Sequence, residues 1–169
     1  MAKSKEEKAD ALMWKLRRWG LPGTKKRAAA EFQKMIRYES ANLETGMVTC
    51  VTCGFSNHWK NSDNKMHAGH YIGGRSHALL FQEETDEVAC NCHPQCAQCN
   101  DTNKKSGNLS SYTPWMIERY GEARVEQLRK LQFAKVANVK YTKEELDDMR
   151  LEYKRRSKIA EKRLIELGV

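Results

Sequence analysis

The sequence contains no long apolar run. No stretch approaches the roughly 18 consecutive apolar residues that indicate a membrane-spanning helix, so we expect no membrane span. The opening residues, MAKSKEEKADALMWKLRRWG, also lack the apolar segment of a secretory signal. Internal repeats and low-complexity tracts are missing too. These absences predict a cytosolic chain, and its length of 169 residues suggests one domain, or a small module with helical extensions.

Apolar residues are scarce as well, and this limits the core. They make up 40% of the 169 residues, against 31% charged residues, and the mean hydropathy is −0.80. A core built from so few apolar side chains needs additional support. Six cysteines could provide it, because clustered cysteine pairs in a reducing cytosol are metal ligands more often than disulfides.

The net charge is +8, and the basic excess is unevenly distributed. Residues 1–49 carry 11 Lys or Arg against 6 Asp or Glu, and residues 109–142 carry 6 against 3. The cysteine-rich centre, residues 50–108, carries 5 against 6. Basic flanks of this kind suit a polyanion such as nucleic acid, whose binding would weaken steeply with salt. The alternative is a merely solvated basic surface.

The residue pattern divides the chain into three regions. Residues 1–46 form a basic helical region, with helices predicted over 5–19 and 24–44 from their apolar spacing. Residues 47–110 break into short strands, MVTCVTCG, KMHAGHYI and DEVACNC, followed by a turn into a short helix. Residues 111–169 are helical again. The predicted fold class is therefore α+β, a small core flanked by helices.

The last predicted helix is long. It begins at Thr142, which stands at capping-box spacing from Glu145. About 25 residues give a length of about 37 Å, more than a small domain needs. Such a helix either protrudes as an arm or dimer contact, which is the reading we favour, or packs on its own domain.

The strongest signal comes from two cysteine pairs at CxxC spacing: Cys50 with Cys53, and Cys96 with Cys99. A CxxC turn lets two thiolates reach one tetrahedral ion, and two such turns close a four-sulfur shell. Zinc is the expected structural ion because it accepts soft ligands and is redox-inert. Cys90 and Cys92 are then either buried thiols, the default, or competing ligands. A thiol redox protein is disfavoured, because its CxxC motif stands singly.

Histidine and asparagine follow the order of a known nuclease motif. HAGHY and Asn91 lie between the two cysteine pairs, and Asn100 follows the last cysteine directly. This order resembles the HNH, or ββα-metal, nucleases. The resemblance implies that His70 is the general base, that Asn91 holds the loop, and that Asn100 binds a catalytic Mg²⁺ or Mn²⁺. The chemistry fits, because a neutral imidazole can take a proton from water and an amide oxygen suits Mg²⁺.

The wider pattern is more specific. The segments CVTCG, AGHY, HPQCAQCN and KSGNL stand in an order that resembles the lambda-type phage recombination family NinG, also called Rap. The resemblance covers roughly residues 48–130. It implies a zinc-stapled HNH-like core and an endonuclease that cleaves branched DNA, including Holliday junctions and D-loops, in the host cytosol. Because both arms of a junction must be cut, we expect a homodimer. Phage or host recombination proteins are further candidate partners.

One position departs from the HNH pattern. Many members carry Asp or His directly before the base, where this chain has Gly69. His67 is the nearest candidate for a second Mg²⁺ ligand. Residues three apart on a strand face opposite sides, so a bulge at Ala68 and Gly69 would be needed. The alternatives are a surface histidine, or water as the ligand.

Other residues are assigned more loosely. His93 could point into the site, touch a phosphate or support the loop. Arg75 could clamp a phosphate through its planar guanidinium. Lys104, Lys105 and Asn108 are either phosphate contacts or solvated side chains.

Two rival functions share these motifs. An HNH nickase of ordinary duplex DNA would need the same site, and a non-catalytic zinc module would bind nucleic acid or protein without cutting it. Aromatic residues such as Trp59 either belong to the core or stack on unpaired bases at a branch point.

Overall fold

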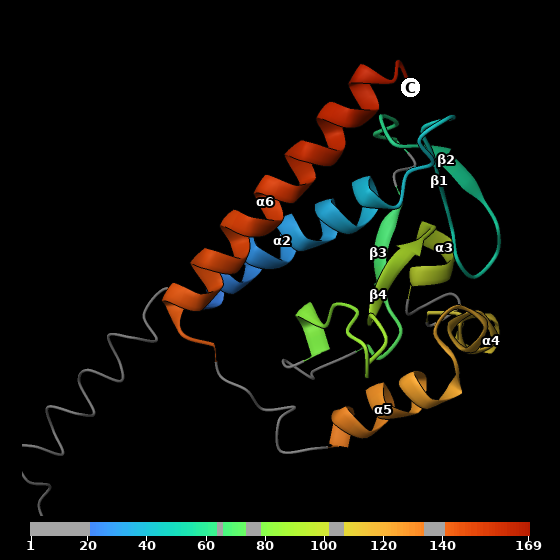
Figure 1. The fold of residues 1–169 in the computed structure, drawn as a ribbon, viewed down its shortest axis with the longest axis vertical. Helices are drawn as coiled ribbons and strands as arrows, with labels where there is room; N and C mark the ends of the chain where they lie inside the picture. Colours follow the sequence, from blue (N-terminus) through green and yellow to red (C-terminus); the bar gives the residue numbers. More distant parts are fainter. Residues whose placement is uncertain (1–20, 64–65, 74–78, 102–106, 134–140) are drawn as a thin grey trace, which may run out of the picture.

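The computed structural model describes residues 21–63, 66–73, 79–101, 107–133 and 141–169. The predicted helix over 5–19 lies outside these residues, as do Arg75, Lys104 and Lys105. Two small antiparallel hairpins lie beside helical segments (Figure 1). This arrangement confirms the predicted α+β class. In the part of the chain described, no helix is long and apolar enough to cross a membrane.

The first hairpin carries the first cysteine pair. It pairs β1 (Met47–Thr49) with β2 (Ser56–His58). The turn between them closes when the Gly54 N–H donates to the Cys50 carbonyl at 2.9 Å. Gly54 adopts a φ of +74°, a left-handed conformation that glycine reaches at little cost.

The second hairpin leads directly into the second cysteine pair. It pairs β3 (His67–His70) with β4 (Cys92–Gln95), and α3 (Ala97–Asn100) follows at once. The register sets His70 opposite Cys92 without interruption along the strands. The chain therefore builds a ββα unit, β3–β4–α3.

The long helical pair consists of α2 (Leu21–Glu39) and α6 (Lys143–Glu166), which lie side by side (Figure 1). α6 begins with the predicted capping box, in which the Glu145 N–H donates to the Thr142 hydroxyl at 3.1 Å. Its Arg156 forms an ion pair with Glu39 of α2 at 2.7 Å. The last helix thus packs on its own domain and does not protrude as an arm.

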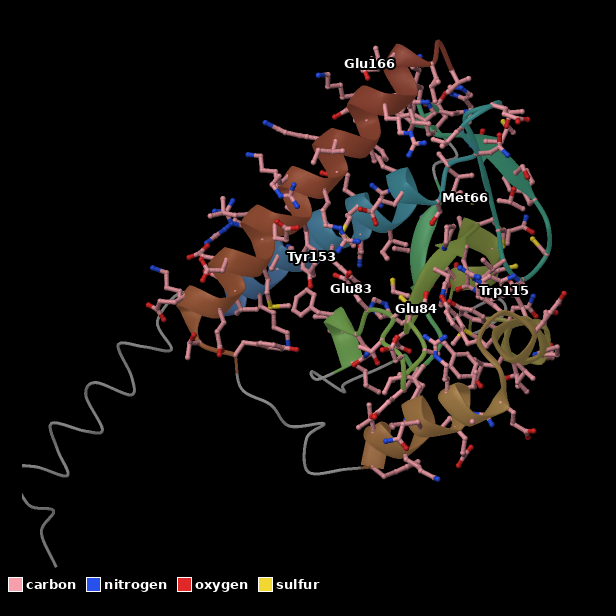
Figure 2. All side chains as sticks on the ribbon, in the orientation of Figure 1. Met66, Glu83, Glu84, Trp115, Tyr153 and Glu166 are labelled. Atoms are coloured by element: carbon pink, nitrogen blue, oxygen red, sulfur yellow. The ribbon has the colours of Figure 1, made fainter. Side chains whose placement is uncertain are left out.

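The main core lies between this helical pair and the second hairpin. Tyr153 of α6 stacks on Phe81 of the short 3₁₀ turn η1 (Leu79–Phe81), with ring centroids 5.9 Å apart. Figure 2 shows Tyr153 directed from α6 towards this turn. One face of β3–β4 is therefore used for packing. The buried members of this core are Ala28, Phe32, Met35, Ala68, Phe81, Cys92, Leu146 and Tyr153.

A shorter helical pair forms a second core. α4 (Leu109–Tyr120) and α5 (Glu122–Phe133) meet at Gly121, where the sequence predicts the break. They enclose apolar side chains from the segments that follow β3 and precede β4. The buried members of this core are Tyr71, Ile72, Leu79, Ala89, Tyr112, Met116, Val125 and Leu128.

The strand predicted at DEVACNC is wrong except for its last residue. Just before Cys92, the backbone of Asn91 bonds to two different segments. Its N–H donates to the Gln82 carbonyl at 3.0 Å, and its carbonyl accepts from the Tyr71 N–H at 2.8 Å. β3 ends at His70, whose partner is Cys92, so regular pairing starts only there. The strand instead runs on from Cys92 to the second cysteine turn.

Helix α2 also differs from its predicted bounds of 24–44. It ends at Glu39, after which the Asn42 side-chain oxygen accepts hydrogen bonds at 2.9 Å from the N–H groups of Glu44 and Thr45. Such side-chain turns compete with the helical backbone. The chain then turns into β1.

Candidate functional site

The four cysteines of the two CxxC turns lie together. All four sulfurs are within 4.8 Å of one another, and Cys53 Sγ lies 3.7 Å from Cys96 Sγ. Sulfurs about 2.3 Å from a tetrahedral zinc stand about 3.8 Å apart. The donor set and spacing therefore fit one zinc ion, which could be held by Cys50, Cys53, Cys96 and Cys99.

This sulfur cluster joins segments that are distant in the chain. Thr52 Oγ1 lies 3.3 Å from Cys50 Sγ, and Asn108 Nδ2 donates to Cys99 Sγ at 3.7 Å. Asn108, one of the predicted phosphate contacts, thus faces the sulfur cluster. Apolar side chains from the turn after α2, from β1, from the residue before β3 and from α6 pack around the cysteines: Ala41, Val48, Met66 and Leu164.

Cys90 and Cys92 have a different environment. Among the described residues, the sulfur cluster includes neither of them. Both side chains are buried, and Cys92 belongs to the main core. Burial raises the pKa of the Cys90 thiol to about 11 and that of Cys92 well above its ordinary value. Both are therefore protonated at neutral pH.

Asn91 is a buried residue that ties two segments together. Its Oδ1 accepts from the Ile72 N–H at 2.8 Å, and its Nδ2 donates to the Leu79 carbonyl at 2.9 Å and the Ile72 carbonyl at 3.2 Å. These three bonds satisfy a side chain with no exposed surface. Asn91 therefore fixes the distance between the segment after β3 and the turn η1.

His70 ends β3 with its ring in a defined hydrogen bond. Nε2 lies 3.0 Å from the Leu80 carbonyl, which can only accept, so Nε2 carries the proton and Nδ1 keeps its lone pair. Burial lowers the pKa of His70, and the bond to Leu80 opposes this with a smaller effect. The imidazole is therefore neutral at neutral pH, with one basic nitrogen.

The structure brings Asn100 together with His67. Asn100 Nδ2 lies 3.2 Å from His67 Nδ1. The β3–β4 register is continuous, so the bulge considered at Ala68 and Gly69 is absent. His67 and His70 therefore project from opposite faces of the hairpin. Within the described residues, no hydrogen bond joins the His70 ring to Asn100.

Gln95, a residue that the motif spacing does not single out, explains why a glycine precedes His70. A Cβ on Gly69 would overlap the Gln95 side chain, meeting its Cδ at 2.7 Å. Gln95 is fully buried, and its Nε2 donates to the Gly107 carbonyl at 2.8 Å. Gln95 therefore fills the volume that Asp or His at position 69 would need.

His93 is held by tyrosines. Its Nδ1 lies 2.8 Å from the Tyr112 hydroxyl and its Nε2 lies 2.7 Å from the Tyr120 hydroxyl. The Tyr112 hydroxyl donates to the Gly69 carbonyl at 3.0 Å, so His93 Nδ1 must donate to Tyr112. Burial, together with the charge of Arg119 and that of His70 once it is protonated at low pH, lowers the pKa of His93 to about 3. This neutral histidine joins β4 to α4.

Zinc content should separate the two classes of cysteine. We expect one zinc ion per wild-type chain, and none in Cys96→Ala, because three thiolates leave the shell open. Structural zinc contributes on the order of 10–16 kcal/mol in finger peptides, so Cys96→Ala should also melt at a much lower temperature. Cys90→Ala is the control and should keep its ion. Native mass spectrometry measures the content, and loss of zinc from Cys90→Ala would contradict the assignment.

Substitution of Gly69 should reveal the packing of Gln95. We expect Gly69→Ala to lower the free energy of unfolding by about 1–3 kcal/mol, as overpacking does. Gly73→Ala is the matched control, because a Cβ there meets nothing within 4 Å. Combining Gly69→Ala with Gln95→Ala should cost less than the sum of the single changes. Urea denaturation measures the wild type, the three single variants and the double variant, and strict additivity would refute the steric argument.

Comparison with known proteins places the chain in a family. A family profile described as Bacteriophage Lambda NinG protein matches residues 1–163. Protein ninG of Salmonella phage P22 is 34% identical over 111 residues, which cover 64% of this chain and 46% of that relative. The chain thus spans about half the length of this curated relative, and no solved structure gave a significant match. Because the profile covers nearly the whole sequence, this chain belongs to the NinG family of phage proteins.

Proposed function

We propose that this protein is a metal-dependent endonuclease that cleaves branched DNA, such as Holliday junctions and D-loops, in phage recombination. Family membership, the β3–β4–α3 unit and the zinc-fitting cysteines support this proposal. The observation that carries it is the state of His70. Its ring is neutral, oriented through one nitrogen and left with a basic nitrogen at the other.

His70 acts as the general base in this proposal. The Leu80 carbonyl holds Nε2–H, so Nδ1 can accept a proton from water while the water oxygen attacks the phosphorus of a phosphodiester. The phosphorus–oxygen bond to the leaving nucleotide breaks in the same displacement, and the leaving oxygen takes up a proton from solvent. Burial lowers the pKa of His70, which keeps Nδ1 unprotonated at neutral pH. The ring would then enter each reaction cycle in its basic form.

Asn100 would hold the catalytic cation through Oδ1, since its Nδ2 faces His67. Such an oxygen ligand suits Mg²⁺, and Mn²⁺ shares the preference. A bound cation supplies Lewis-acid stabilisation of the scissile phosphate. His67, whose Nδ1 lies 3.2 Å from Asn100 Nδ2, would be the second protein ligand of that cation or would orient the Asn100 amide. His93 has a supporting role, because both its nitrogens are bonded to tyrosines.

A junction offers two strands to cut, so two copies of the chain are needed for a symmetric reaction. α6 exposes three large apolar side chains, Leu151, Ile159 and Ile165, which could take part in such a dimer. The net charge of +8 favours DNA as the partner, with the salt dependence typical of phosphate contacts. The host cytosol is the proposed site of action, and recombination proteins are proposed as further partners.

Removal of the base tests catalysis against a non-catalytic zinc module. We expect His70→Ala to cut a four-way junction about 10²–10⁴-fold more slowly than wild type, because general-base catalysis contributes about that much. Junction binding and zinc content should not change. Single-turnover kinetics with Mg²⁺ measure the rate. If His70→Ala cuts at the wild-type rate, His70 is not the base.

Asn100 supplies the matched comparison. Asn100→Ala should be as inactive as His70→Ala, while Asn100→Asp keeps an oxygen ligand and should retain part of the activity in Mn²⁺. If wild-type protein with bound zinc cuts nothing in Mg²⁺ or Mn²⁺, the binding module becomes the better description.

Substrate choice separates the branched-DNA proposal from a nickase of ordinary duplex. We expect cleavage of a four-way junction to exceed that of a linear duplex of the same sequence by at least about tenfold at equal concentration, since about 1.4 kcal/mol of transition-state discrimination suffices. Denaturing gels of end-labelled strands measure both rates. Equal rates on the two substrates would discard the branch specificity and leave the nickase.

A further inference from the structure

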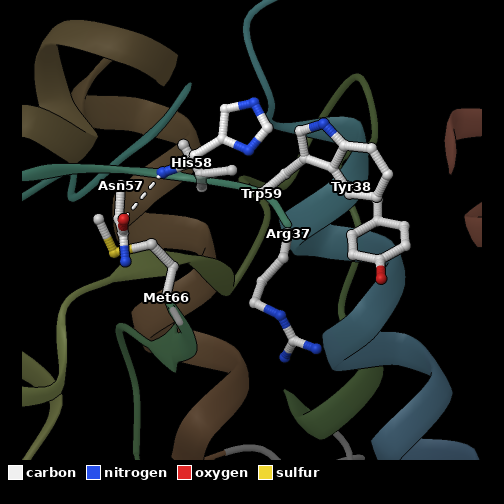
Figure 3. A pocket seen from close by; sticks show the side chains of 7 residues that line it. Arg37, Tyr38, Asn57, His58, Trp59 and Met66 are labelled. Carbon is white, nitrogen blue, oxygen red and sulfur yellow. Dashed lines mark hydrogen bonds between the residues drawn. The ribbon is translucent and has the colours of Figure 1, made fainter. Parts of the chain in front are cut away.

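Aromatic and basic side chains gather where β2 meets the end of α2. The rings of His58, Trp59 and Tyr38 line one side of a small pocket (Figure 3). Tyr38 and Trp59 lie edge to face with centroids 5.4 Å apart, and the centroids of His58 and Trp59 are 6.1 Å apart. We call the following residues the aromatic–basic patch: Lys34, Arg37, Tyr38, His58, Trp59 and Lys60.

The rings of this patch are held in place before any ligand binds. A Cβ on Gly46 would meet His58 Nε2 at 2.6 Å and Trp59 Cδ1 at 3.0 Å, so both rings pack directly on the glycine backbone. Trp59 Nε1 donates to the Val169 carbonyl at 3.2 Å, and its backbone N–H donates to the Gly46 carbonyl at 2.9 Å. Rings that are already oriented lose little conformational freedom when a base stacks on them.

The patch is positively charged. The Lys60 ammonium lies 5.2 Å from the Trp59 ring centroid, and Lys34 lies 4.9 Å from that of Tyr38 and 3.6 Å from Glu161. Within the described ranges, the Arg37 guanidinium makes no hydrogen bond or ion pair, and Figure 3 draws none to it. Burial lowers the pKa of Arg37. Burying the charged guanidinium costs free energy, and among the described residues no carboxylate pairs with it. An anion bound beside Arg37 would offset this cost.

The pocket beneath the rings is too small for a base. Its volume is about 10 Å³, enough for a single water molecule. An aromatic ligand must therefore lie against the outer side of the rings. The half-buried state of Tyr38 and Trp59 leaves part of each ring open for such a contact.

We propose that the aromatic–basic patch binds an unpaired nucleotide of branched DNA, with the base stacked on Trp59 and the phosphate paired with Arg37. Bases inside a duplex are already stacked on their neighbours, so only a branch or a single strand offers a free base face. The inference rests on the proposed function, because it assigns the recognition of the branch to residues outside the β3–β4–α3 unit.

Fluorescence anisotropy with zinc-loaded protein and no added divalent cation tests the patch without cleavage. The probes are a labelled oligothymidine and a labelled duplex of the same length. We expect Trp59→Ala to weaken binding to oligothymidine by about 5- to 150-fold, the range that stacking of a base on one aromatic ring provides. Binding to duplex should change by less than about twofold. Equal losses on both probes, or no loss on either, would overturn the proposal.

Charge variants give a second measurement that does not depend on the tryptophan. Arg37→Ala should reduce the slope of log K against log salt for oligothymidine by about 0.7, the value for one phosphate contact on a single strand. Lys60→Glu changes an exposed residue without threatening the fold and should also weaken binding to oligothymidine. An unchanged slope for Arg37→Ala would remove the phosphate contact from the proposal.

The controls come from α5. Phe133→Ala removes an aromatic ring that is 85% exposed, and Lys130→Ala removes an exposed charge; neither should alter binding to oligothymidine. Trp59→Phe keeps a stacking face and should bind better than Trp59→Ala, while thermal melting checks that each variant is folded. A protein that binds oligothymidine through Trp59 but cuts no junction would keep this inference and refute the proposed nuclease. A protein that cuts junctions but binds oligothymidine equally well with and without Trp59 would keep the proposed nuclease and refute this inference.

Discussion

The rest of the fold depends on the meeting of four cysteine sulfurs. Two turns 43 residues apart come together when Cys53 and Cys96 lie 3.7 Å from each other. Each hairpin has strands of only three or four residues, and an isolated two-stranded hairpin is marginal in water. An ion at this point would fix the end of β4 and the start of α3. The position of Asn100, one residue beyond the last cysteine, follows from the same constraint.

The parts of the fold that could be predicted are those encoded over short distances. CxxC spacing, the break at Gly121 and the cap at Thr142 each depend on residues within a turn of one another, and the structure contains all three. Long-range packing decided the rest. The predicted strand at DEVACNC is misplaced because β3 ends at His70, and pairing with β4 therefore starts only at Cys92. Sequence spacing does not indicate Gln95, because its burial over Gly69 depends on the register of the two strands.

The cysteine cluster was predictable from its spacing, whereas the relative placement of the two histidines on β3 was not. His67 and His70 stand at opposite ends of β3, about 10 Å apart along the strand. One side chain faces Asn100, and the other is bonded to Leu80. A cation at the first position and a base at the second would therefore approach a phosphate from different sides. The alternation of side chains along a strand indicates that His67 and His70 face opposite sides, whereas the order of the motifs alone suggests that they lie in one cluster.

The contact between α2 and α6 has a consequence for synthesis on the ribosome. Arg156 and Glu39 are 117 positions apart, so α6 is made long after the helix it covers. At about 5–20 residues per second, the apolar side of α2, with Phe32 and Met35, awaits its partner for roughly 6–23 s. During that interval the nascent chain exposes the apolar side of α2 to solvent. We therefore expect it to bind chaperones that shield hydrophobic segments during synthesis.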